Sequence, residues 1–101
     1  MVYKFRLYIT PRTSNSQRAI SNLDALCQEE LDGQCEIEII DVTLQPTLAE
    51  RDHILATPTL VKRFPDPVKR IIGDLSDRVK VLTTLDLVAT PAPMTVRVKA
   101  E

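Results

Sequence analysis

The chain has 101 residues, with 13 lysines and arginines against 14 aspartates and glutamates, and a net charge of −1. This length provides one domain with a single core, and the near-neutral charge gives no reason to expect a nucleic-acid partner. No apolar run approaches the length of a membrane span. The first residues alternate charged and apolar side chains, unlike a secretory signal. We therefore expect a cytoplasmic protein that binds neither nucleic acid nor membranes.

The first half of the chain predicts a strand, a helix and a second strand. Residues 3–10 alternate apolar and polar side chains, which is typical of a strand. Ser14 followed by Gln17 is a capping-box pattern at the start of a helix, and Gly33 is expected to end that helix. Alternation returns at residues 35–42 and predicts the second strand. Because such crossovers are almost always right-handed, the two strands should be parallel.

The second half predicts a short helix followed by a hairpin. Pro46 suits the first turn of the helix. Strands are expected at residues 59–62 and 68–72, joined by a turn that contains Pro65 and Pro67. The turn is short, so the two strands should be antiparallel neighbours.

A last helix is expected after Gly73, capped by Asp74 or Ser76. Its apolar face is predicted to carry Leu75, Val79, Leu82 and Leu85. The complete order of elements is that of an α/β protein with the thioredoxin fold, in which a proline, here Pro58, opens the third strand. We expect residues 1–88 to form this domain, and residues 89–101 to be a tail or an extra edge strand.

The two cysteines do not predict redox chemistry. Cys27 and Cys35 are eight residues apart, without the spacing of a redox motif or enough neighbours for a zinc site. We expect both to be reduced, buried and core-filling. In an active thioredoxin two cysteines stand at the start of the first helix, where this chain has Thr-Ser-Asn-Ser at residues 13–16. Since serine cannot exchange disulfides, redox catalysis is not expected.

Other enzyme classes also lack their parts. His53 is the only histidine, so Ser-His-Asp and metal-cluster schemes are not expected, and a solvent-facing turn is its predicted place. The two glycines do not form a phosphate-binding loop. A glutathione-transferase-like use of the scaffold would need an extra helical domain that this length excludes. We expect a non-enzymatic protein without a metal or cofactor.

Several motifs go beyond what the thioredoxin fold requires. They are LY at residues 7–8, TSNS at 13–16, RA at 18–19, IDV at 40–42, QPTLAE at 45–50, ILATPTL at 54–60, PVKRIIGDLSD at 67–77 and LDL at 85–87. In these motifs the chain resembles the KaiB family, the small partners of KaiC ATPases in the cyanobacterial circadian clock and in related bacterial systems. The sensor domain of SasA-type kinases is a similar relative, but it typically lacks the GDLSD string of residues 73–77 in this form.

The resemblance implies a metamorphic protein. KaiB proteins are known in a thioredoxin-like state that binds the KaiC hexamer, and in a ground state whose second half is rebuilt and which self-associates as dimers or tetramers. Pro58, Pro65 and Pro67 stand at the junctions of that half, where slow prolyl isomerisation would slow interconversion. Asp86 matches a position linked to the balance between the folds, and Thr84 stands where the family often has glycine.

The resemblance also implies partners and the residues that meet them. Tyr8, Arg18, Lys69, Arg70 and Asp74 match family positions implicated in partner contact or in holding the assembly. Their structural alternatives are a half-buried ring and solvated surface charges. The implied partners are a KaiC-type ATPase, KaiA or a SasA-type kinase, and further copies of the chain.

Two functions stay open at this point. The first is a KaiC-binding regulator, which serves either a circadian clock and its biological rhythms or a KaiC-linked stress or timing response. A non-circadian role is an equal alternative because His53 stands where lysine is usual, and because Ala-Thr-Pro-Ala-Pro at residues 89–93 replaces the acidic tail of the clock proteins. The second is a thioredoxin-like sensor module of SasA type that binds the same partner without a clock role.

Overall fold

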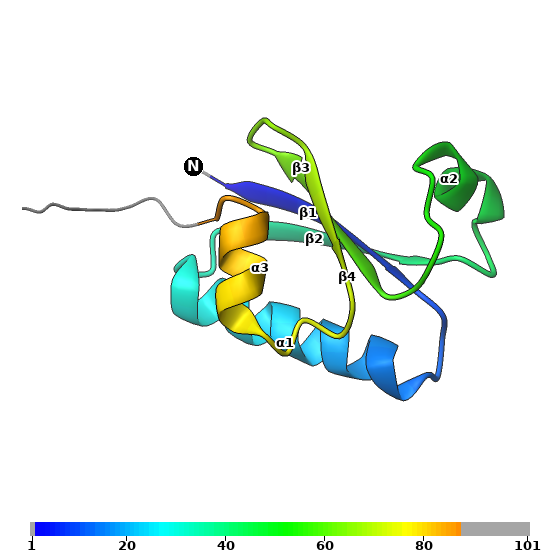
Figure 1. Cartoon of the computed structure of the whole chain (residues 1–101), viewed down its shortest axis with the longest axis horizontal. Coiled ribbons are helices and arrows are strands. Elements are labelled where there is room, and N and C mark those ends of the chain that lie inside the picture. The colour runs from blue at the N-terminus through cyan, green and yellow to red at the C-terminus, as the bar shows by residue number, and fades with distance from the viewer. Residues whose placement is uncertain (1, 88–101) are drawn as a thin grey trace, which may run out of the picture.

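The computed structural model describes residues 2–87, which form a four-stranded sheet in the order β2-β1-β3-β4 (Figure 1). The elements, in chain order, are β1 (Tyr3–Ile9), α1 (Ser14–Glu30), β2 (Cys35–Asp41), α2 (Pro46–Arg51), β3 (Thr59–Phe64), β4 (Lys69–Ile72) and α3 (Arg78–Thr84). β1 is parallel to β2 and antiparallel to β3, and β3 is antiparallel to β4. The predicted α/β thioredoxin-like order is therefore confirmed. The expected tail or extra edge strand at 89–101 lies outside the described residues.

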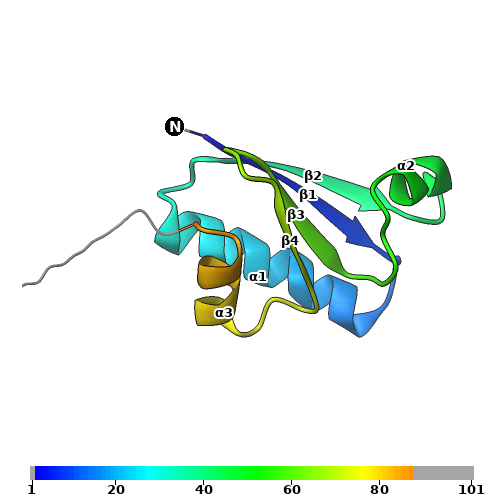
Figure 2. The same ribbon diagram turned by 45° about the horizontal axis from the view of Figure 1, so that its top comes forward.

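The main core lies on the face of the sheet that α1 and α3 cover (Figure 2). Strand side chains alternate between faces, so Phe5 and Leu7 of β1 point into this core and are 2% and 0% exposed. Leu85 and Leu87, which follow α3, are buried in the same cluster as these two residues. Full burial of one such side chain contributes about 1.5–3 kcal/mol. The core therefore joins β1 to the residues that follow α3.

A second, smaller cluster lies on the opposite face, under α2. Tyr8, Ile40, Ala49 and Val61 form its buried part. Tyr8 follows Leu7 in β1, so the period of two directs these neighbours to opposite faces. This cluster fixes α2 and the turn after it against the sheet.

The helix ends correct two expectations. The N-cap of α1 is Thr13 rather than Ser14, because Thr13 has the extended backbone of a cap and its hydroxyl accepts from the Ser16 N–H at 3.3 Å. At the other end Gly33 has φ 71 and donates to the Cys27 carbonyl at 2.9 Å, as a helix-terminating glycine does. The cap of α3 is Asp77, which accepts from the Lys80 N–H at 3.1 Å.

The later start of α3 changes which side chains it buries. Asp74 and Ser76 are not its cap, because Asp77 itself has an extended backbone with ψ 90, so no helical residue precedes Arg78. Since the helix begins at Arg78, its buried face is set by Val81 and Leu85, four residues apart and 1% and 0% exposed. Val79, predicted on the apolar face, is instead 73% exposed.

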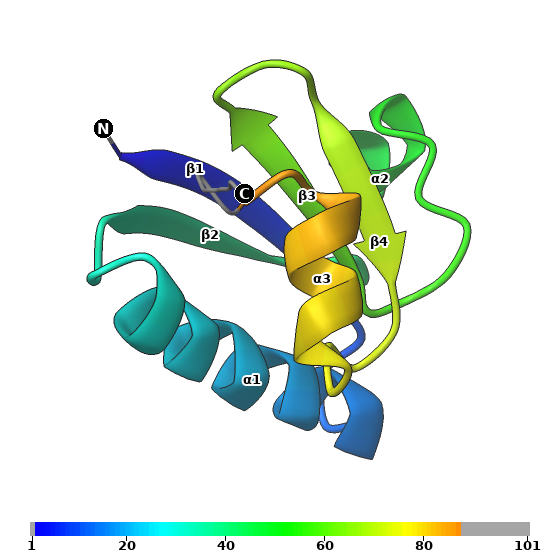
Figure 3. The ribbon, with the colours of Figure 1, turned by 60° about the vertical axis from the view of Figure 1, so that its left-hand side comes forward.

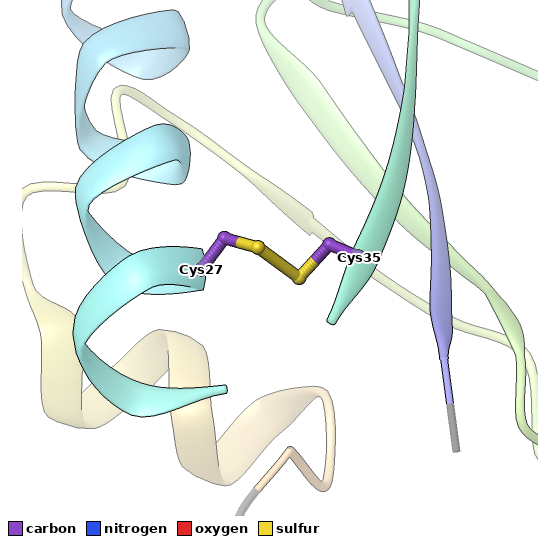
Figure 4. The surroundings of a disulfide bond; sticks show 2 residues. All are labelled: Cys27 and Cys35. Atoms are coloured by element: carbon purple, nitrogen blue, oxygen red, sulfur yellow. A yellow bond between two sulfur atoms is a disulfide. The ribbon is translucent and has the colours of Figure 1, made fainter. Parts of the chain in front are cut away.

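The expectation of two reduced cysteines is wrong. Cys27 in the last turns of α1 and Cys35 at the start of β2 form a disulfide, with Cα atoms 6.3 Å apart (Figure 4). The tight turn through Gly33 folds β2 back on α1 and brings the two Cα atoms within the range that a disulfide spans. The expected burial is right for Cys27, which is 3% exposed, whereas Cys35 is only partly buried.

None of the helices within residues 2–87 is both long enough and apolar enough to cross a membrane.

Candidate functional site

Three segments converge at the N-terminal end of α1 (Figure 3). The hydroxyls of Thr10 and Thr57 lie 2.6 Å apart, and the Gly73 N–H donates to the Pro58 carbonyl at 2.9 Å. The Thr10 N–H in turn donates to the Ser16 hydroxyl at 3.2 Å. These bonds hold residues 13–18, 56–58 and 73–76, which we call the loop surface, as neighbours although they are far apart in the sequence.

The loop surface brings together two predicted partner-binding residues, Arg18 and Asp74. The Arg18 Nε donates to the Asp74 Oδ2 at 3.1 Å, and its guanidinium also donates to the Asn15 side chain. Asp74 is held from two more sides, since its Oδ1 accepts from the Ser76 N–H at 3.1 Å and its carbonyl accepts from Asn22 at 2.8 Å. Hydrogen bonds from Ser76, and then from Arg18, lower the pKa of Asp74. The surface thus presents an ordered arginine beside a carboxylate that is ionised at neutral pH.

The predicted basic pair on β4 contacts two different elements. Lys69 Nζ lies 3.4 Å from the Asp86 carboxylate, just after α3. Arg70 donates to the His53 carbonyl at 3.2 Å, after α2. As neighbours in a strand the two side chains point to opposite faces. The structure therefore does not bring Lys69 and Arg70 into one patch. His53 itself is exposed in a turn, as expected.

The remaining predicted partner-binding residue, Tyr8, is 0% exposed. Its hydroxyl donates to Asp52 Oδ2, which also lies 3.4 Å from an Arg6 nitrogen and 3.5 Å from an Arg63 nitrogen. Arg6 is held in turn by Glu38 at 2.8 Å. Burial, and then the hydrogen bond to Asp52, raise the pKa of Tyr8. Tyr8 therefore holds Asp52 in place rather than lying on the surface.

Asp52 is the residue that sequence reasoning missed. Burial acts to raise its pKa, but the hydrogen bond from Tyr8 and the charges of Arg6 and Arg63 outweigh burial, so the pKa of Asp52 is lowered. Its three partners stand on β1 and β3, and no local sequence motif predicts that they contact Asp52.

We expect Asp52→Asn to destabilise the protein near neutral pH by about 1–3 kcal/mol, because the buried Tyr8 hydroxyl and the largely buried Arg6 guanidinium lose a charged acceptor. A carboxylate with a lowered pKa contributes stability above its unfolded pKa of about 4, and this contribution disappears as the pH falls through the folded pKa. Urea unfolding between pH 7 and pH 2 should therefore show wild type and Asp52→Asn converging in acid. The control is Asp66→Asn at an exposed residue of the β3–β4 turn, whose free energy of unfolding should differ from that of wild type by the same small amount at every pH. A difference between Asp52→Asn and wild type that stays constant with pH would contradict the stabilising role of the Asp52 carboxylate.

The residues predicted for fold switching lie at the ends of β3, β4 and α3, in the second half of the fold. Pro58, Pro65 and Pro67 each follow a cis peptide bond, the first before β3 and the others in the β3–β4 turn. Thr84 is the last residue of α3, and Asp86 has φ 53 and pairs with Lys69. The described conformation is the thioredoxin-like one.

The start of α1 decides the class of the protein. Thr13 and Ser14 occupy the position where an active thioredoxin has its cysteines, and the disulfide of this chain lies at the opposite end of α1. Among the described residues no group of three or more His, Cys, Asp or Glu side chains is placed to hold a metal ion. Fold and site together define a thioredoxin-like protein that lacks cysteines at the start of its first helix.

Within that class the chain belongs to the KaiB family, because the family model of the KaiB domain matches residues 6–87. The circadian clock oscillator protein KaiB of Prochlorococcus marinus subsp. pastoris is 54% identical over 85 residues, 84% of this chain and 79% of that protein. The circadian clock protein KaiB3 of Synechocystis is 53% identical over 83 residues, 82% of this chain and 81% of that protein. The relatives are thus named as clock proteins.

Solved structures support the fold. The N-terminal domain of Synechococcus elongatus SasA has a TM-score of 0.68 at 25% identity, covering 88% of each chain. The germline-specific thioredoxin Deadhead of Drosophila melanogaster has a TM-score of 0.68 at 16% identity, covering 87% of this chain and 82% of that one, which is a likeness of fold alone.

Proposed function

We propose that the protein is a non-enzymatic cytoplasmic regulator that binds a KaiC-type ATPase hexamer in its thioredoxin-like state. The observation that carries the proposal is the family match over residues 6–87, which includes both the loop surface and the second half of the fold. The arginine of the loop surface supports it. Arg18 is 54% exposed yet held by Asp74 and Asn15, and an ordered arginine is a favourable contact residue because little side-chain freedom remains to be lost on binding.

We further propose that the second half changes fold, so that a self-associated ground state competes with partner binding. α3 has only seven residues, too few to be stable alone, so its helix depends on tertiary contacts. Apolar side chains are exposed at the two ends of the edge strand β4, since Val68, just before it, is 57% exposed and Ile72, its last residue, is 58% exposed. Exposed apolar residues on an open edge favour pairing with another copy.

The test is size-exclusion chromatography with light scattering on the full chain alone, and then during hours of incubation with the KaiC hexamer of the same organism and ATP. We expect a dimer or tetramer alone, and slow co-elution with KaiC as the self-associated peak disappears, because a minor binding state reduces the observed rate. A monomer that forms no complex at any time would overturn the proposal. Incubation without ATP is the control for nonspecific co-elution.

A second candidate is a sensor module of SasA type that binds the same partner without a clock role. The likeness to the SasA N-terminal domain favours it. A rigid module of this kind would bind KaiC at once and would not first leave a self-associated peak. Deletion of the gene, followed by recordings of rhythms and of stress responses, separates a circadian role from a stress or timing role. KaiA and a SasA-type kinase are the further partners to add to the KaiC binding mixture.

A further inference from the structure

We propose that Cys27 and Cys35 form a reversible thiol–disulfide exchange site, closed by a small disulfide of the glutathione class, whose closed bond stabilises the packing of α3 on the first half of the fold. The bond joins the last turns of α1 to the first residue of β2 (Figure 4). It lies at the opposite end of α1 from the loop surface and does not depend on the function proposed above.

The two cysteines differ in access from solvent. Cys27 is 3% exposed, whereas Cys35 is only partly buried and stands on β2, an edge strand of the sheet. Its neighbours Gln34 and Glu36 are both exposed. An incoming reagent therefore meets Cys35 first, and Cys27 acts as the resolving partner.

The exchange balances with oxidised glutathione as the oxidant. The Cys35 thiolate attacks one glutathione sulfur, the glutathione disulfide breaks, and one glutathione leaves as a thiolate. The Cys27 thiolate then attacks the Cys35 sulfur of this mixed disulfide and releases the second glutathione. Two protein thiols are oxidised, one glutathione disulfide is reduced, and the two protons end on the glutathione thiols. An excess of reduced glutathione reverses both steps.

On the Cys27 side, the turn that the disulfide closes contributes a core residue against which the end of α3 packs. The Cys27 carbonyl accepts from the N–H groups of Leu31 at 3.1 Å and Gly33 at 2.9 Å. Leu31 is buried in the main core together with Leu85 and Leu87. A change in the position of the last turn of α1 therefore reaches the residues that anchor the end of α3.

On the Cys35 side, the neighbouring strand β1 holds the residues that follow α3. Tyr3 is the register partner of Cys35, and its hydroxyl donates to the Leu87 carbonyl at 3.0 Å. Arg78, the first residue of α3, pairs with Glu30 at 3.4 Å. The disulfide therefore fixes α1 and β2 relative to each other beside Glu30 of α1 and Tyr3 of β1, which hold α3 and the residue Leu87 that follows it. Its opening should loosen α3 before the rest of the fold.

The first experiment is a titration of the full chain in glutathione buffers of graded reduced-to-oxidised ratio, with acid quench, thiol alkylation and intact-mass analysis. We expect an intramolecular disulfide that forms and opens reversibly across this range. The variant Cys27→Ser should stop at the glutathione adduct on Cys35, and Cys27→Ser/Cys35→Ser should not respond. A wild-type chain that stays reduced at every ratio, or one that reduced glutathione never opens, would overturn the proposal.

The second experiment compares amide hydrogen exchange in the oxidised and reduced wild-type chain, which needs no variant to fold. We expect exchange at residues 81–87 to be slower in the oxidised form by up to roughly 50-fold, the limit set by the full stabilisation from a disulfide that closes a short loop. α2, on the opposite face, is the internal reference and should change much less. Equal exchange in the two forms, or equal slowing in α2 and α3, would overturn the link between the bond and α3.

Discussion

Replacing Leu85 by alanine is expected to lower the free energy of unfolding by about 2–5 kcal/mol, because the change leaves a cavity in the main core. Leu85 is 0% exposed and lies in one cluster with Phe5, Leu7 and Leu60. It comes from the C-terminal end of α3, whereas these partners come from β1 and β3. The residue therefore joins the second half to the first. Urea unfolding of the full chain at protein concentrations low enough to keep it monomeric measures the effect on the thioredoxin-like state.

The matched control is Val79→Ala in the same helix. Val79 is 73% exposed, so its truncation should change the free energy of unfolding by less than about 0.5 kcal/mol. If the thioredoxin-like state binds KaiC, a loss of about 2 kcal/mol in that state reduces its population roughly 30-fold, and Leu85→Ala should form the complex correspondingly slowly. Equal midpoints for the two variants in the monomeric chain would contradict the burial of Leu85 in the thioredoxin-like state.

Reversing the charge at Arg18 is expected to have the largest effect on partner binding. Arg18→Glu removes an exposed arginine and places a carboxylate beside Asp74, whose oxygen lies 3.1 Å from the Arg18 Nε. Truncation of an arginine at the centre of an interface typically costs about 2 kcal/mol or more, which is roughly 30-fold in affinity. The stability of the free protein should change little, because exposed ion pairs contribute about 0–1 kcal/mol. Titration of the KaiC hexamer, with urea unfolding in parallel, separates the two effects.

Two variants sharpen this test. Arg51→Glu makes the same charge change on an exposed residue of α2, outside the loop surface, and should bind like wild type. The exchange Arg18→Asp/Asp74→Arg keeps an ion pair but moves the guanidinium to the 73–76 segment. If the arginine itself contacts the partner, this variant stays weak, whereas full recovery would mean that only the pairing matters. Normal binding by Arg18→Glu would remove the loop surface from the interface.

The secondary structure was predictable because its signals are local. The alternation in β1 and β2 and the apolar stripe of α1 follow from periods of two and 3.6 residues, and Gly33 ends α1 through a backbone conformation that glycine adopts readily. The misplaced cap of α3 has a tertiary cause. Asp74 was a reasonable cap by residue type, but its side chain and carbonyl are engaged by Arg18 and Asn22 of α1.

The candidate site was only partly predictable. The family motifs identified Arg18 and Asp74, and the structure brings them together. The same motifs included Tyr8, whose ring is fully buried, because a motif records which residues occur and not which face of the sheet they occupy. Asp52 had no signal at all, since its partners Tyr8, Arg6 and Arg63 reach it from strands distant in the sequence.

Composition and periodicity were sufficient for the order of the elements and for the absence of cysteines at the start of the first helix, and the resemblance of the motifs to those of KaiB proteins was sufficient for the family. These properties follow from neighbours along the chain. Tertiary structure alone decided the disulfide between Cys27 and Cys35, the burial of Tyr8 and the exposure of Val79. Each of these depends on which elements approach in space and on the rotation of each element about its own axis. Close packing of α1, α3 and the sheet around one core determines both, and the spacing of residues along the chain does not.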